Sequence, residues 1–459
     1  MSIKNIIHTS IALILFSCTT IHEKQNPLMY HGCIVDDYNP IWVVAKDTAS
    51  NSAWSELNPM PIVDDKTIVG SYKNGCPGFR CLEIETGKII WEWYADANIE
   101  NSKFGAYLSC TKGQTYTITT DKKYLIFAWN PSLFDQLSML HIAIDVATGK
   151  EVWRKNIPSQ GSIHIGYDAY DDYYYCSAFN IYTPENSKYH NQNAYKVRIS
   201  DGQIDEVFRP TTEVKIGAHC RAIPFSLKEK KYLLVTEKIF LDEEDEDNHT
   251  YKYGIIDRQT WDTLAWHDDA DKYLPVQPSA IHVYNDVVYV MFGLGGYSIL
   301  NLGKKQFTEN YIWGKKSHNI VDGKKVQATA DWYTCSYFYN NKIIIGMNFQ
   351  TTQNLQSHSQ DAQLPFHIAL PRGLLIDAST NKMIKHVHTE HNPSIMDGIL
   401  YYTENHNFYA FDINTGEKKI DLYICDYEAS GTSSVYKNAK GEKFVIVSNV
   451  DYTYCFPGL

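Results

Sequence analysis

Eight short polar turns recur along the chain at a near-constant spacing, and this repeat constrains the fold more than any other feature. Each turn separates two apolar, strand-like runs, as in residues 62–69. Asn, Asp and Gly tolerate positive φ, so they favour tight β-hairpins. The turns lie 57, 50, 58, 56, 55, 57 and 43 residues apart, at Asp64, Asp121, Asp171, Glu229, Asn285, Asn340, Asp397 and Lys440. The spacing predicts eight repeats, each containing a hairpin.

A second signature follows most of these hairpins. It consists of an apolar-x-apolar-Asp run, three further residues, a Gly, and then an apolar strand that often holds Trp. The clear copies occupy residues 81–91, 142–153 and 409–416, degenerate copies occupy 196–202, 255–266 and 375–381, and residues 299–307 hold the weakest one. The Asp carboxylate can accept backbone N–H groups of the turn, and Gly supplies a left-handed residue. Each period therefore contains a second hairpin, which makes four strands.

A four-stranded antiparallel sheet cannot bury its face alone, so such sheets must pack against one another. Radial packing gives a β-propeller. We predict an all-β protein: an eight-bladed β-propeller of four-stranded antiparallel blades. The last period shows only three strands, and residues 41–45 are predicted to supply the fourth and so close the ring. The alternative is a seven-bladed ring with the C-terminal hairpin as an appendage.

The composition agrees with a β-rich protein. The chain contains 34 Tyr, and aromatic residues make up 14% of it; these side chains suit a pleated, half-buried surface. The formal net charge of -11 argues against nucleic-acid binding, which requires a basic surface.

Two copies of the second signature, residues 82–91 and 143–153, resemble the repeat of pyrroloquinoline-quinone (PQQ)-type propellers. This group includes quinoprotein dehydrogenases and non-enzymatic lipoproteins such as the BamB component of outer-membrane barrel assembly. As architecture the resemblance extends over residues 41–459. It implies the fold much more firmly than the function.

Residues that would mark an enzyme of this group are missing from the sequence. Quinoprotein alcohol dehydrogenases carry two adjacent cysteines beside the cofactor, and the chain has no Cys-Cys pair. The Gly-x-Ser-x-Gly and His-Glu-x-x-His signatures of common hydrolases are also absent. We therefore predict no catalytic residue, no bound cofactor and no metal, and an enzyme is the less favoured hypothesis.

The N-terminus has the pattern of an export signal. Lys4 precedes an apolar run over residues 6–16, which is too short to span a bilayer as a helix. The run ends in Leu15-Phe16-Ser17-Cys18, which resembles the bacterial lipoprotein box and implies lipid attachment at Cys18. We predict a signal peptide over residues 1–17, a tether over 18–32 and the propeller over 33–459. The protein would be an outer-membrane lipoprotein of a Gram-negative cell envelope, on its periplasmic or its surface face.

Several polar clusters have two interpretations each. Cys76 and Cys81 either close a short disulfide loop or remain free thiols, and free thiols are the favoured interpretation. The acidic run 242–247 either binds Ca²⁺ or is a solvated insertion, which we favour because it lacks the spacing of a calcium loop. A metal site is the less favoured interpretation for His386, His388 and His391.

The tyrosines of the blade strands also have two interpretations. They either line a sugar-binding face or pack within the sheets, and packing is the favoured one. They are Tyr170, Tyr173, Tyr174, Tyr175, Tyr401 and Tyr402.

The sequence therefore favours a non-catalytic binding or scaffold lipoprotein. It would present its rim loops to a protein partner and reach the membrane through its lipid anchor. The alternative is an enzyme or a glycan-binding propeller with a site built from rim loops, where propeller function usually resides.

Overall fold

A computed structural model describes most strands and turns of the chain. No helix in this part of the chain is long and apolar enough to cross a membrane. The described residues are 38–46, 60–73, 76–95, 116–129, 138–158, 164–179, 194–208, 220–240, 249–267, 274, 278–292, 296–312, 318–321, 324–327, 335–346, 373–387, 393–404, 407–424, 432–449 and 452–459.

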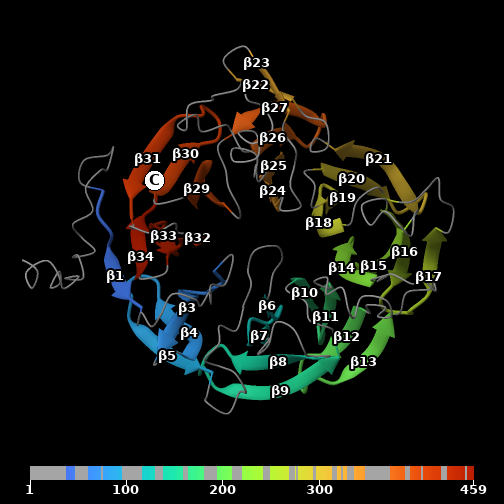
Figure 1. The fold of residues 1–459 in the computed structure, drawn as a ribbon, viewed down its shortest axis with the longest axis horizontal. Coiled ribbons are helices and arrows are strands. Elements are labelled where there is room, and N and C mark those ends of the chain that lie inside the picture. Colours follow the sequence, from blue (N-terminus) through green and yellow to red (C-terminus); the bar gives the residue numbers. More distant parts are fainter. Residues whose placement is uncertain are drawn as a thin grey trace, which may run out of the picture.

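The described strands form eight four-stranded antiparallel sheets and one two-stranded sheet. The eight sheets stand around a central axis as the blades of a ring (Figure 1). This confirms the predicted eight-bladed β-propeller and excludes the seven-bladed alternative.

Within blades 1 to 7 the strands follow one another from the inside of the ring to the outside. Blade 1 contains β2 (Ile62–Val63), β3 (Lys66–Lys73), β4 (Cys76–Glu83) and β5 (Ile89–Tyr94). Blade 2 contains β6 (Tyr116–Ile118), β7 (Tyr124–Trp129), β8 (Ser138–Asp145) and β9 (Glu151–Pro158). Blade 3 contains β10 (His164–Tyr170), β11 (Tyr173–Phe179), β12 (Ala194–Arg198) and β13 (Ile204–Phe208). Blade 4 contains β14 (Cys220–Leu227), β15 (Lys230–Phe240), β16 (His249–Asp257) and β17 (Thr263–His267).

The second half of the ring continues this order. Blade 5 contains β18 (Pro278–Tyr284), β19 (Val287–Phe292), β20 (Gly296–Asn301) and β21 (Gln306–Ile312). A separate hairpin, β22 (His318–Val321) and β23 (Lys324–Gln327), precedes blade 6, which contains β24 (Cys335–Tyr339), β25 (Lys342–Gly346), β26 (Gly373–Asp377) and β27 (Lys382–Val387). Blade 7 contains β28 (Ser394–Met396), β29 (Ile399–Glu404), β30 (Asn407–Asp412) and β31 (Lys418–Tyr423). Blade 8 contains β32 (Thr432–Lys437), β33 (Lys443–Ser448), β34 (Tyr452–Pro457) and β1 (Trp42–Ala45).

The eight predicted turns join the first and second strands of the blades. Each contains a residue in the left-handed region, which explains the preference for Asn, Asp and Gly. These residues are Asp64, Lys122, Asp171, Glu229, Asn285, Asn340, Asp397 and Gly441.

The second signature forms the turns between the third and fourth strands. In blade 2, Asp145 Oδ1 accepts the backbone N–H of Thr148 at 2.8 Å, and Gly149 has a φ of 70°. In blade 7, backbone N–H donors from Thr415 and Asn414 hold the pKa of Asp412 below its usual value. The Asp and Gly of the repeat therefore act as the sequence predicts.

The N-terminal strand closes the ring. β1 pairs antiparallel with β34, with Trp42 opposite Cys455 and Ala45 opposite Tyr452 (Figure 1). Tyr38 donates from Oη to the Pro457 carbonyl at 2.6 Å. The predicted clasp is confirmed.

Tryptophans on three outer strands join consecutive blades by the same contact. Trp42 Nε1 of blade 8 donates to the Ile84 carbonyl of blade 1 at 2.7 Å. Trp91 of blade 1 reaches Val146 of blade 2 at 2.8 Å, and Trp153 of blade 2 reaches Ile199 of blade 3 at 2.7 Å. Each indole thus supplies both apolar area and a satisfied donor.

The hydrophobic core lies between blades. Between blades 1 and 2, the ring of Phe127 makes edge contacts with Phe79 and Trp93 at centroid distances of 4.8 and 5.2 Å. Such contacts add to the area buried by each aromatic ring. A blade is therefore stable only with its neighbours, as the repeat predicts.

Candidate functional site

The two faces of the ring differ in how the chain crosses them. The turn face, as we call it, carries the short turns that join first to second and third to fourth strands, at residues such as Asp64 and Gly87. The connection face lies at the opposite ends of the strands. It receives the connections from second to third strands and from each fourth strand to the next blade. The longest of these run from β25 to β26, over 347–372, from β21 to β24, over 313–334 with the hairpin of β22 and β23, and from β5 to β6, over 95–115.

Ion pairs join neighbouring blades on the turn face. Lys122 of blade 2 contacts Asp64 of blade 1 at 2.8 Å, and Lys228 of blade 4 contacts Asp286 of blade 5 at 3.1 Å. These four side chains are more than half exposed, so each pair adds little stability. The turn face is thus a polar surface on which some of the charges are paired between blades.

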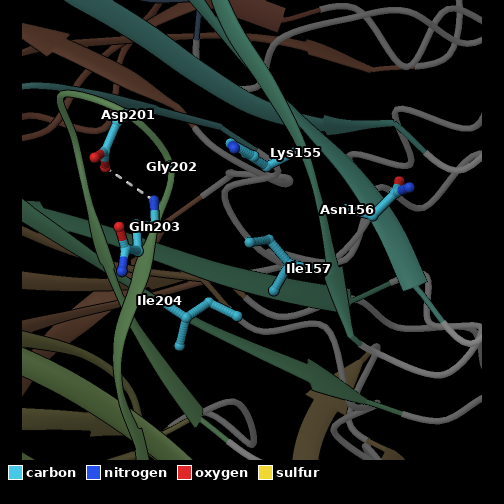
Figure 2. A pocket seen from close by; sticks show the side chains of 7 residues that line it. All are labelled: Lys155, Asn156, Ile157, Asp201, Gly202, Gln203 and Ile204. Carbon is cyan, nitrogen blue, oxygen red and sulfur yellow. Dashed lines mark hydrogen bonds between the residues drawn. The ribbon is translucent and has the colours of Figure 1, made fainter.

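A groove opens on the outer wall between blades 2 and 3 (Figure 2). Its volume is about 300 Å³, and it is lined by Lys155, Asn156 and Ile157 of β9 and by the turn residues 201–204 of blade 3. Ile157 is buried and, with partly buried Ile204, belongs to the core between the two blades. The groove therefore has an apolar floor and polar walls.

The turn side of the groove is fixed by hydrogen bonds. Asp201 Oδ1 accepts the backbone N–H of Gln203 at 3.0 Å, which Figure 2 shows as a dashed line, and Oδ2 accepts from Arg198 at 3.1 Å. Gly202 has a φ of 70°, and a Cβ there would lie 2.8 Å from the rings of Trp153 and from Lys155 Cγ. Glycine is therefore required for this turn to approach β9 so closely.

A buried His–Tyr pair lies in the same inter-blade region. His141 Nδ1 of β8 lies 2.8 Å from Tyr174 Oη of β11, and His141 is 1% exposed. Burial lowers the pKa of His141 to about 3, because the charged imidazolium would lose its hydration. The folded ring therefore holds this histidine neutral.

We expect this histidine to make the ring less stable in acid. Its folded pKa is below the unfolded value of about 6.5, so its contribution is fully retained above pH 6.5. Between pH 6.5 and 3 only the unfolded chain takes the proton, and the free energy of unfolding falls by about 1.4 kcal/mol per pH unit. Urea unfolding of the parent and of His141→Gln at pH 7 and 5 measures this loss. The loss of unfolding free energy between pH 7 and pH 5 is expected to be about 2 kcal/mol larger in the parent than in His141→Gln. Equal losses in both proteins would contradict a buried, neutral His141.

The structure corrects one interpretation of the cysteines. Cys81 is a free, buried thiol, and burial raises its pKa to about 12. Cys76 and Cys81 both lie in β4, where five residues of extended strand span about 17 Å. That separation is far beyond the reach of a disulfide. The disulfide alternative is wrong.

The other sequence candidates are only partly within the described residues. His386 lies in β27 opposite Leu374, whereas His388, His391, the acidic run 242–247 and Cys18 lie outside the described residues. Four of the tyrosines are buried within the blades, so they do not form a sugar-binding surface: Tyr174, Tyr175, Tyr401 and Tyr402.

A metal and quinone site of the dehydrogenase type would need clustered metal ligands and an adjacent cysteine pair. These ranges contain no group of three or more His, Cys, Asp or Glu side chains placed to hold a metal ion. The adjacent cysteine pair is also missing from the sequence. The described residues therefore do not fit a metal and quinone site of the dehydrogenase type.

Solved structures share this architecture. A europium-containing methanol dehydrogenase matches with a TM-score of 0.56 at 12% identity, covering 92% of this chain and 93% of that one. The quinohemoprotein alcohol dehydrogenase from Comamonas testosteroni matches with a TM-score of 0.53 at 12% identity, covering 91% and 76%. The chain shares the β-propeller fold of these two dehydrogenases. BamB from Moraxella catarrhalis gives a TM-score of 0.48 at 11% identity, covering 90% and 100%.

The likenesses to the two dehydrogenases confirm the predicted quinoprotein-like propeller at the level of the fold. No family model and no curated protein sequence matches the chain. At such identities the function has to be argued from the residues of this chain.

Proposed function

We propose that this protein is a lipid-anchored scaffold of the cell envelope that binds a protein partner through its connection face. This proposal rests on the difference in loop length between the two faces of the ring. The turn face is built of short turns, some of whose charges pair between blades, whereas the connection face receives every long connection of the ring. Connections held on a rigid scaffold are the usual place for recognition.

The path of the N-terminal chain supports an orientation. Residues 38–41 reach β1 from the turn face, where Tyr38 stacks on Phe456 at 5.4 Å and binds Pro457. Cys18 precedes Tyr38 by 20 residues, and a flexible chain of that length has an end-to-end distance of about 25 Å. An anchor at Cys18 would keep the turn face nearer to the membrane and present the connection face to a partner.

Site-specific photocrosslinking in cells tests the use of the connection face. Ala45 and Lys73 are exposed at the connection-face ends of β1 and β3, whereas Lys150 and Lys440 are exposed on the turn face. A photoreactive residue at Ala45 or Lys73 is expected to capture a protein partner, and one at Lys150 or Lys440 is not. Capture from the turn face alone, or from neither face, would rule out the proposed surface.

Cys18→Ala tests the anchor. We expect this variant to lose labelling by a fatty-acid probe and to leave the membrane fraction, because the acylated thiol is the predicted attachment point. Cys33→Ala is a matched control and should be labelled like the parent. If Cys18→Ala still carries the probe, the lipoprotein prediction is wrong.

A further inference from the structure

Beside the groove between blades 2 and 3, blade 2 differs from blade 1. Two residues after the docked tryptophan, blade 1 has Trp93, which is buried against Phe127 of blade 2. The same position in blade 2 is Lys155, two residues after Trp153. A core indole is thus replaced by an exposed, polar side chain, and the space beside it stays open.

The turn opposite Lys155 differs from the corresponding turns of blades 1 and 2 as well. After the left-handed glycine, blades 1 and 2 have Lys88 and Lys150, and blade 3 has Gln203. Before this glycine, blade 3 has Asp201, whereas the other two blades have threonine. Both departures fall on the walls of one groove, and departures from a repeat often mark a site of function.

The groove combines donors and acceptors without a net charge. Lys155 supplies a positive charge, Asp201 a negative one, and the amides of Asn156 and Gln203 can both donate and accept. Figure 2 shows Lys155 and Asp201 on the two walls, with Ile157 between β9 and the turn. Such a lining suits a neutral ligand that carries many hydroxyl groups and a C–H surface to pack on the floor.

We propose that this groove binds one neutral sugar unit. Its volume of about 300 Å³ is near the lower limit for small-molecule sites, so it admits a single ring. A peptide added to a strand edge would be held by main-chain hydrogen bonds, whereas this groove offers four polar side chains. The site is separate from the connection face and does not depend on the lipid anchor.

Ligand-observed NMR titrations of the full chain with glucose, galactose and mannose test the proposal. We expect saturable binding of at least one of these hexoses. Lys155→Trp restores the residue type of blade 1 and fills the groove, and Gln203→Lys adds a second cation. Each is expected to weaken binding about tenfold or more, because hydrogen bonds to the sugar are lost.

Controls separate binding from folding. Lys150→Gln changes an exposed lysine of the neighbouring turn and should bind like the parent. Asn156→Ala removes a single amide without filling the groove, so weaker binding with an unchanged melting temperature supports a direct contact. The proposal is overturned if no hexose binds saturably, if Lys155→Trp binds as tightly as the parent, or if glucuronate or triglycine binds more tightly than every neutral hexose.

Discussion

Deletion of residues 38–46 is expected to lower the free energy of unfolding by about 5 kcal/mol or more, which is comparable to the whole stability of many domains. The deletion removes β1 and its pairing with β34, and it removes the indole of Trp42 from its site on blade 1. It also uncovers Phe456, which is 1% exposed and stacks against Tyr38. An unpaired β34 would then present free backbone donors and acceptors to other chains.

Urea unfolding and size-exclusion chromatography of the deletion measure this loss and the expected aggregation. Deletion of residues 19–30 is the matched control, because it shortens the predicted tether without touching the clasp; its unfolding midpoint should equal that of the parent. A clasp deletion that melts with the parent and stays monomeric would show that the ring does not depend on β1 for closure.

The repeat could be predicted because its chemistry is local. Asp145 and Gly149 act within one turn, through a hydrogen bond three residues away and a left-handed φ. Such requirements involve only a few adjacent residues. The number of blades therefore follows from the spacing of the turns, and so does the need for an N-terminal strand to complete blade 8. The packing partner of each blade is far away in sequence, and there the prediction is less complete.

The interface between blades 3 and 4 shows this limit. Trp261 occupies the glycine position of its turn with a φ of 61°. The Nζ of Lys196 lies 4.0 Å from its ring centroid and 4.2 Å from that of Tyr173. Burial lowers the pKa of Lys196, and the two rings offset part of that loss of hydration. The sequence does not predict this contact, because the motif is degenerate in blade 4 and Lys196 is 65 residues before Trp261.

The groove between blades 2 and 3 was also missed, although the sequence contained a signal. Alignment of the copies in blades 1 and 2 places Lys155 opposite Trp93, a polar residue where blade 1 has a core indole. Whether the space beside Lys155 stays open depends on how closely the turn at Gly202 of blade 3 approaches β9. The sequence alone does not show this distance. A departure from a repeat therefore locates a candidate site before its shape is known.

Gly149→Ala is expected to lower the free energy of unfolding by about 2 to 5 kcal/mol. Gly149 has a φ of 70°, and an added Cβ would lie 2.5 Å from the indole of Trp91. The ring is 8% exposed and is held by the hydrogen bond to Val146, so it has little room to shift. Left-handed strain costs about 1 to 2 kcal/mol, and overpacking adds about 1 to 3 kcal/mol.

Gly441→Ala is the matched control because it separates the two costs. Gly441 has a φ of 84°, but no atom lies within 4 Å of an added Cβ. Its alanine variant should lose only about 1 to 2 kcal/mol from backbone strain. Urea unfolding of both variants measures the difference, which is the contribution of the indole contact.

A double-mutant cycle assigns that difference to Trp91. In a Trp91→Leu background the indole is gone, so Gly149→Ala should cost no more than Gly441→Ala does in the parent. The predicted coupling of about 1 to 3 kcal/mol would then belong to the contact between blades 1 and 2. If Gly149→Ala lowers the free energy of unfolding equally with and without Trp91, Gly149 is needed only for the left-handed turn. The glycine of the repeat would then stabilise each hairpin and would not contribute to the contact between blades.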